Sequence, residues 1–217
     1  MSDSFPPYQE LADFLLRGFD ANLGGGAHDL SHVARVWRIA RRIARTEPGC
    51  DEELLAAAVI LHDCVAVEKN APARALSSRL SAARAREIVA TLSWTAARAD
   101  ALAHAIETHS FSAGLEPRTR EARILRDADR LDAIGAIGIA RCFHVGGRMH
   151  GALYHPGDPT AVSRPLDDRG FALDHFATKL FMLAEGFLTP EGQRMAAART
   201  KLMRDYVAAF LAEIDGE

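Results

Sequence analysis

The spacing of the apolar residues is the feature that most constrains the fold of this chain. Apolar positions recur at helical spacing over long stretches, alanine is abundant, and the alternating runs of β-branched residues that are typical of strands are missing. Glycine and proline gather at a few points, such as 24–26 and 48–49, where they would end helices. The sequence therefore predicts an all-α fold, a single helical domain of about seven to nine helices that spans residues 1–217.

Capping residues and helix breakers set the expected boundaries of the helices. Asp51 and Thr189 are expected as N-caps, and Pro117 suits the first position of a helix. Residues 145–168 hold four glycines and three prolines without a helical period, so we expect a long loop or flap there, which could cover a pocket. The expected helices cover about residues 8–22, 29–46, 51–67, 77–94, 96–110, 117–129, 131–143, 169–186 and 190–214.

The composition argues against several classes of protein. The 217 residues carry 26 basic and 29 acidic side chains, a net charge of -3, which is not the balance of a general binder of nucleic acid polymers. No stretch is apolar for long enough to span a membrane, and the N-terminal segment has no apolar core typical of a secretory signal. Three cysteines without a CxxC pair fit a reducing compartment, so we expect a cytoplasmic protein.

The expected second helix carries the first candidate for chemistry. His32 lies one turn before Val36, in line with the apolar positions that follow, so it points to the buried side of the helix. A single buried histidine is more often part of a core than a ligand. Arg35 lies one turn from His32, whereas the other arginines of this helix fit an exposed face.

His62 and Asp63 form the second candidate. His62 falls in the apolar face of the expected third helix, and a carboxylate beside such a face costs several kcal/mol unless it is paired or bound to a metal. Two neighbouring ligand types of this kind suit a cation that is held between helices. A His-Asp pair also occurs by chance, so the dipeptide by itself decides little.

The third candidate is the acidic segment 126–132, which lies between two apolar runs. Asp127, Asp129 and Asp132 crowd this segment and require a counter-charge. The arginines within the segment could supply that charge, and a metal ion is the functional alternative. The residues alone do not choose among the three aspartates.

The order His32, His62-Asp63, Asp129 in an all-α chain resembles the HD superfamily of metal-dependent phosphohydrolases. The likeness extends over residues 8–214 and is greatest to bacterial stand-alone HD-domain hydrolases, a subfamily associated with nucleotide pyrophosphohydrolase activity. It implies that these four residues hold one divalent metal ion, with Mn²⁺ favoured and Asp129 as the fourth ligand. Two imidazoles and two carboxylates also suit Mg²⁺, Fe²⁺, Co²⁺, Ni²⁺ or Zn²⁺. The segments that carry the likeness are HDLSHVARVWRIA from His28, AAAVILHDCVAVEKN from Ala56, HSFSAG from His109, DADRLDAIGAIGIAR from Asp127 and TPEGQRMAAARTKLM from Thr189.

Positive charge is needed around the phosphates of such a substrate. Lys69, a rare lysine in the loop after the third helix, is our first candidate both for binding the substrate and for the catalytic role of offsetting charge on the leaving pyrophosphate, with a solvated loop lysine as the alternative. Arg35 and His109 are further candidates for substrate binding. For His109, which lies at the end of an expected helix, a role in the core or in capping is equally consistent. Asp63 could orient the attacking water through its second oxygen.

The expected reaction is hydrolysis of a nucleoside triphosphate to the monophosphate and pyrophosphate. Alternatives are a phosphomonoesterase or phosphodiesterase that acts on another small phosphorylated metabolite, a non-catalytic ligand-binding HD domain, and a helical interaction module with structural histidines. Ala66 stands where alarmone hydrolases of the superfamily carry an acid, which argues against that substrate. We expect a small phosphorylated partner, no nucleic acid polymer and no membrane, and a homodimer is left open.

Overall fold

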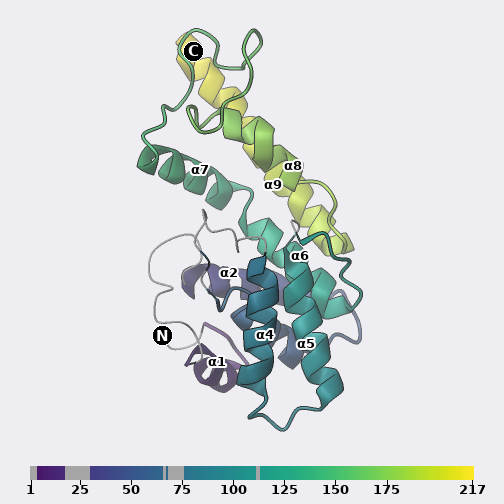
Figure 1. Ribbon diagram of the computed structural model, residues 1–217. Helices are drawn as coiled ribbons and strands as arrows, with labels where there is room; N and C mark the ends of the chain where they lie inside the picture. Colours follow the sequence, from purple (N-terminus) through teal and green to yellow (C-terminus); the bar gives the residue numbers. More distant parts are fainter. Residues whose placement is uncertain (1–3, 18–29, 66, 68–75, 111–112) are drawn as a thin grey trace. The chain divides into compact units, whose positions relative to one another are not determined.

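The computed structural model describes residues 4–17, 30–65, 67, 76–110 and 113–217. Within these ranges the chain forms nine α-helices and one π-helix and no strand, so the predicted all-α fold is confirmed. One isolated parallel bridge joins Ala152 and Phe171. The helices are α1 (Gln9–Leu16), α2 (Leu30–Ala44), α3 (Glu52–Leu61), α4 (Ser77–Val89), α5 (Ala96–His109), α6 (Arg120–Asp132), α7 (Ala136–Arg148), the π-helix η3 (Phe176–Leu180), α8 (Phe181–Leu183) and α9 (Pro190–Asp215) (Figure 1).

The chain divides into two compact units, residues 1–129 and 130–217, and each is described by itself. The single domain over 1–217 therefore stays a prediction, as does the homodimer. Among the described helices, none combines the length and the apolar character that a membrane crossing requires. The cytoplasmic location stays a prediction.

Helix α3 is the centre of the N-terminal unit. Every residue from Leu54 to Leu61 is buried, and α3 packs against α1, α2 and α5. A helix that is apolar on all sides requires such complete cover. His62, the residue directly after α3, is fully buried, so the chain is still in the core of the unit at this point.

The two ends of α3 are set by different kinds of contact. Asp51 caps its start as predicted, accepting a backbone hydrogen bond at 2.9 Å, and Arg98 of α5 donates to both carboxylate oxygens of Asp51. The predicted extension of this helix to residue 67 is wrong, because α3 ends at Leu61. Just beyond it, the backbone N–H of Val65 donates to the hydroxyl of Ser81 in α4 at 3.3 Å. This contact draws the chain away from the helix axis.

Helix α6 begins and ends later than predicted. It starts at Arg120, so the first helical position predicted for Pro117 is wrong. Thr119 takes the capping role instead, since its hydroxyl oxygen accepts a hydrogen bond from a backbone N–H of the first turn at 3.2 Å. The helix continues to Asp132, so Asp129 lies within its last turn and is not its last residue.

An aromatic cluster holds the C-terminal unit together. The ring of Phe143 in α7 lies beside those of Phe176 in η3 and of Tyr206 and Phe210 in α9, and Phe176 also stacks on Tyr206, with ring centroids 5.8 to 6.1 Å apart. Aromatic rings at such separations attract one another through their edges and faces. Thr189 caps α9 as predicted, with its hydroxyl oxygen accepting a backbone hydrogen bond at 3.1 Å.

The predicted loop over 145–168 begins later than expected, because α7 extends to Arg148. The chain from 149 to 175 is largely irregular, but hydrogen bonds between its own residues hold it in place. Arg164 donates hydrogen bonds at 2.6 and 2.8 Å to the buried carboxylate of Asp174, which also accepts from the backbone N–H of Asp167. These contacts turn the chain, so the helix predicted from residue 169 begins only at Phe176. The role of the loop as a lid stays a prediction.

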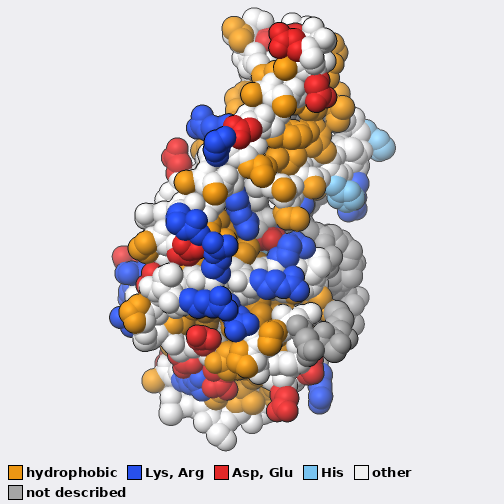
Figure 2. All heavy atoms as spheres, turned by 180° about the vertical axis from the view of Figure 1, so that it is seen from behind, with side chains coloured by type: hydrophobic (Ala, Val, Ile, Leu, Met, Phe, Trp, Pro, Cys, Tyr) orange, Lys and Arg blue, Asp and Glu red, His pale blue; other side chains and the backbone are white. Residues whose placement is uncertain are grey.

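Among the described residues, large apolar side chains are exposed mainly in the C-terminal unit, and Figure 2 shows many hydrophobic side chains on the side of this unit that it presents. In the described part of the N-terminal unit, Leu76 and Leu80 are the large apolar side chains that are exposed. The exposed large apolar side chains of the C-terminal unit are Ile137, Met149, Leu153, Val162, Leu166, Met182, Leu188 and Leu202.

Candidate metal centre

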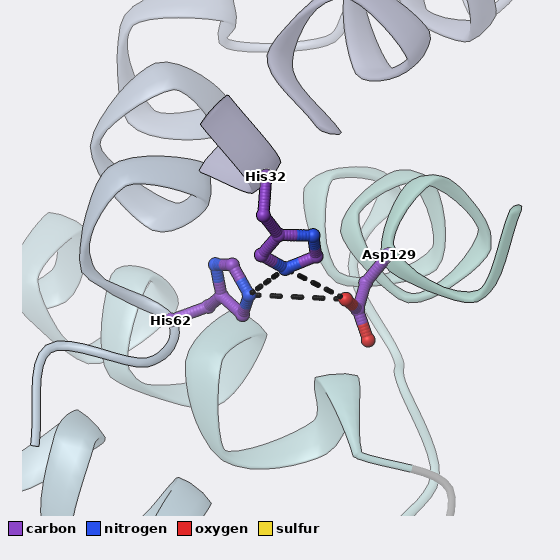
Figure 3. A group of neighbouring side chains, drawn as sticks. All are labelled: His32, His62 and Asp129. Carbon is purple, nitrogen blue, oxygen red and sulfur yellow. Dashed lines mark hydrogen bonds and ion pairs between the residues drawn. The ribbon is translucent and has the colours of Figure 1, made fainter. Parts of the chain in front are cut away.

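Helices α2, α3 and α6 bring His32, His62 and Asp129 together (Figure 3). His32 lies in the first turn of α2, on its buried face, and is 1% exposed. His62 follows directly on α3 and is fully buried, and Asp129 lies in the last turn of α6 with its side chain 29% exposed. The packing of three apolar helix faces thus places three polar side chains in one small space.

The ligand-type atoms of these residues are close enough to share one ion. Nε2 of His32 lies 3.4 Å from Nε2 of His62 and 3.4 Å from Oδ1 of Asp129, and Nε2 of His62 lies 3.8 Å from the same Oδ1. An ion that binds imidazole nitrogen and carboxylate oxygen at about 2.0–2.2 Å can join atoms up to about 4.4 Å apart. All three distances meet this limit, so the geometry fits a single cation.

Asp63 lies beside this group and extends it. Its Oδ2 is 3.7 Å from Nε2 of His62, within the same limit. Its Oδ1 is 3.8 Å from Nε2 of His109, at the end of α5. The ligand atoms of His62, Asp63 and His109 thus form a second close group, which shares His62 with the first.

The backbone of α3 fixes the orientation of the His62 ring. Nδ1 of His62 lies 2.7 Å from the carbonyl oxygen of Val59. A carbonyl can only accept, so Nδ1 carries the hydrogen and donates it, and Nε2 presents its lone pair to the cluster. Histidines that bind metals typically have such a partner on the other ring nitrogen.

The electrostatics of the site favour a neutral imidazole and an ionised carboxylate. Complete burial lowers the pKa of His62, because the charged ring loses its solvation there. Burial by itself would raise the pKa of Asp129, but the hydrogen bond from His32 and the neighbouring imidazoles bring it below its usual value. Cation binding requires both groups in these states.

The three aspartates of the acidic segment have different surroundings. Asp129 lies within 4 Å of two imidazoles, whereas Asp132 is buried and faces Arg141 at 3.9 Å. Asp127 is also buried. Two residues turn an α-helix by about 200°, so Asp127 and Asp129 point to nearly opposite sides of α6. Only the packing of α6 decides which of the two meets the histidines.

The structure describes Arg35 and His109 among the three candidates for substrate binding. Arg35 is half-buried on α2, and its guanidinium donates to the hydroxyl of Ser31 at 2.9 Å. Lys69 lies outside the described residues, and so does Ala66.

His109 has neighbours that sequence reasoning missed. The sequence gives it an inward direction at the end of a helix, with substrate binding, core packing and capping as alternatives. The structure places its ring 5.0 Å from the ring of His62, and its Nε2 faces Asp63. The sequence does not predict that His109 lies beside His62 and Asp63, because this placement follows from the packing of α5 on α3.

Comparison with known proteins gives the family of this chain. The HD domain matches residues 29–134. The uncharacterized protein YpgQ of Bacillus subtilis is 30% identical over 193 residues, which are 87% of this chain and 85% of YpgQ. The chain belongs to the HD domain family.

Solved structures of bacterial proteins have a similar fold over almost the whole chain. A Lactobacillus plantarum protein is 31% identical with a TM-score of 0.68, and the match covers 96% of each chain. An HD-superfamily hydrolase of Bacillus thuringiensis is 26% identical with a TM-score of 0.71, covering 96% of this chain and 95% of that one. A structure of YpgQ in complex with ADP is 26% identical with a TM-score of 0.67, covering 94% and 93%.

The segment that matches the HD domain includes the whole cluster, from His32 in α2 to Asp129 in α6. His62, Asp63 and His109 lie between these two. The C-terminal unit lies almost entirely beyond the HD match, but the full-length relatives cover it as well. Both units are thus common to this chain and its HD relatives.

Proposed function

We propose that this protein is a metal-dependent phosphohydrolase. The observation that carries the proposal is a cluster of ligand atoms in which Nε2 of His62 lies 3.4 to 3.8 Å from its three neighbours. Two imidazoles and two carboxylates suit a divalent transition metal, and Mn²⁺ is our first choice, with Mg²⁺, Fe²⁺, Co²⁺, Ni²⁺ or Zn²⁺ as substitutes. The four proposed ligands are His32, His62, Asp63 and Asp129.

The proposed substrate is a nucleoside triphosphate, with the monophosphate and pyrophosphate as products. The likeness to YpgQ supports a nucleotide, because one structure of that protein is a complex with ADP. In the reaction the oxygen of a water molecule bonds to the α-phosphorus. The bond from this phosphorus to the bridging oxygen breaks, pyrophosphate leaves with the electron pair of that bond, and the protons of the water pass to the products and the solvent.

The chain provides groups for each part of this reaction. A bound divalent cation would lower the pKa of a bound water and offset the negative charge of the phosphates. Asp63 can orient the water, since its two oxygens face two different imidazoles. Arg35, one turn from His32, and Lys69 would bring positive charge to the phosphates.

A panel of ribo- and deoxyribonucleoside triphosphates, incubated with the protein and Mn²⁺, tests the proposal. Separate assays for monophosphate, pyrophosphate and inorganic phosphate identify the bond that is cleaved. We expect equal amounts of monophosphate and pyrophosphate from the wild type and none from Asp129→Ala. The matched control Asp205→Asn alters an exposed acid of α9 and should keep full activity.

Other products would point to other functions. Release of inorganic phosphate without pyrophosphate would place the cleavage at the terminal phosphate and contradict attack at the α-phosphorus. No product from any nucleotide, with metal bound, would contradict nucleotide hydrolysis and leave either another phosphorylated metabolite as the substrate or a ligand-binding HD domain. No bound metal would contradict the proposal at its first step.

A further inference from the structure

His109 is oriented in the same way as His62, although it is not one of the four proposed ligands. It is the last residue of α5 and is 6% exposed. Its Nδ1 lies 2.6 Å from the carbonyl oxygen of Ile106, three residues earlier, just as Nδ1 of His62 lies 2.7 Å from that of Val59. Because a carbonyl only accepts, Nδ1 of His109 donates, and in the neutral ring Nε2 presents a lone pair.

The lone pair of His109 faces the carboxylate of Asp63. The distance from Nε2 of His109 to Oδ1 of Asp63 is 3.8 Å, which is longer than a hydrogen bond. The other oxygen, Oδ2, faces His62 at 3.7 Å. With His109 neutral, its Nε2 and Oδ1 of Asp63 both face this gap as hydrogen-bond acceptors, and a group that donates a hydrogen to each of them fits between the two atoms.

A water molecule fits this gap better than a second cation. A water that donates one hydrogen to each acceptor over about 2.8–2.9 Å bridges such a separation and keeps its oxygen lone pairs for a third direction. A second cation would need more ligands. The group of described residues around His109 also contains His62, but the single lone pair of its Nε2 is already used by the proposed cation.

We propose that Nε2 of His109 and Oδ1 of Asp63 together hold the water that attacks the substrate phosphorus. The inference rests on the proposed hydrolase function and names a group that positions its nucleophile. With both hydrogens directed to these acceptors, an oxygen lone pair points away from them and toward phosphorus. Correct placement of an attacking group is a large part of catalysis, and an error of about 1 Å costs about 100-fold in rate.

Two substitutions of His109 separate this role from others. In His109→Gln the amide oxygen can accept the hydrogen of the water, whereas His109→Asn carries the same amide on a shorter side chain that does not reach. The control is His144→Gln, an exposed histidine of α7. Each full-length variant is loaded with Mn²⁺, its bound metal is counted by equilibrium dialysis, and kcat and KM are measured on the best nucleotide of the panel. Thermal unfolding checks that each variant is folded.

We expect one equivalent of Mn²⁺ in every variant, with an unchanged dissociation constant for Mn²⁺. His109→Asn should lower kcat about 100-fold at constant KM, and His109→Gln should recover most of that loss. Two equivalents in the wild type and one in His109→Asn would overturn the proposal, because His109 would then be a ligand of a second cation. An unchanged kcat in His109→Asn would also overturn it. No Mn²⁺ in the wild type would instead refute the proposed hydrolase function itself.

Discussion

Nε2 of His32 and Oδ1 of Asp129 lie 3.4 Å apart, although the two residues are far apart in the sequence of the N-terminal unit. Helix α2 supplies the histidine from its buried face, and α6 supplies the aspartate from its last turn. Removing such polar groups from water is costly unless a proton or a cation joins them. The pair therefore couples the stability of the N-terminal unit to occupation of the proposed metal site.

Removal of the metal should destabilise the wild-type protein. A cation present at about 100 times its dissociation constant adds about 2.7 kcal/mol to the free energy of unfolding. For a chain of this length that corresponds to about 5–10 °C in melting temperature. Thermal unfolding of the Mn²⁺-loaded protein, with and without EDTA, measures the shift. His62→Ala and Asp129→Ala should show no shift in melting temperature with EDTA, and Asp205→Asn should show the full shift. An unchanged melting temperature of the wild type in EDTA would contradict the proposed metal site.

Acidification should destabilise the metal-free protein near pH 6. Burial lowers the pKa of His62 below its usual value of 6.5. Below about pH 6.5 the unfolded chain therefore binds a proton at this residue that the folded chain does not, so stability falls as the pH falls. The pKa of Asp129 is also lowered, so its contribution is complete above the usual carboxyl range and is lost only at much lower pH.

Urea unfolding in EDTA at pH 7.5 and pH 5.5 measures this dependence. His62→Gln should have a weaker pH dependence than the wild type, because the titrating ring is gone. His144→Gln removes an exposed ring and should behave as the wild type does. The same loss of stability on acidification in His62→Gln and in the wild type would refute the assignment to His62.

Gly138 should not tolerate alanine. A Cβ atom at this position of α7 would collide with the backbone carbonyl oxygen of Ala133. Such overpacking costs about 1–3 kcal/mol, more than the gain of about 1 kcal/mol in helix propensity. Gly147 lies in the same helix with nothing within 4 Å of an added Cβ, so Gly147→Ala should be neutral or slightly stabilising. Urea unfolding compares the two variants, and equal stabilities would contradict the collision.

The features that depend on local chemistry could be predicted from the sequence. Asp51 and Thr189 cap helices as predicted, because an N-cap needs only a side-chain oxygen and the backbone that follows it. His32 and His62 are buried as their positions in the apolar periodicity indicate. Periodicity gives the direction of a side chain but not its neighbour across the core.

The features that depend on tertiary contacts could not be predicted. Helix α3 stops at Leu61 because the chain turns toward Ser81 of α4, and residues before Phe176 turn because Asp174 binds Arg164. The same limit applies to the acidic segment, where Asp129 was singled out by family resemblance and not by spacing. These outcomes depend on how the helices pack against one another. The order of residues along the chain does not show this packing.

Arg35→Ala and Lys69→Ala should weaken substrate binding without loss of metal. A hydrogen bond from a charged group is worth about 1.5–3 kcal/mol, which corresponds to a rise in KM of about 10–100-fold. If these proposed contacts hold the phosphates equally before and during the reaction, kcat should change less than KM. Steady-state kinetics at saturating Mn²⁺ measure the effect, with Arg38→Ala, an exposed neighbour on α2, as the control. A direct contact should make the rise in KM larger for Arg35→Ala than for the exposed Arg38→Ala. An equal rise in both variants would contradict such a contact and indicate that α2 acts through its overall charge.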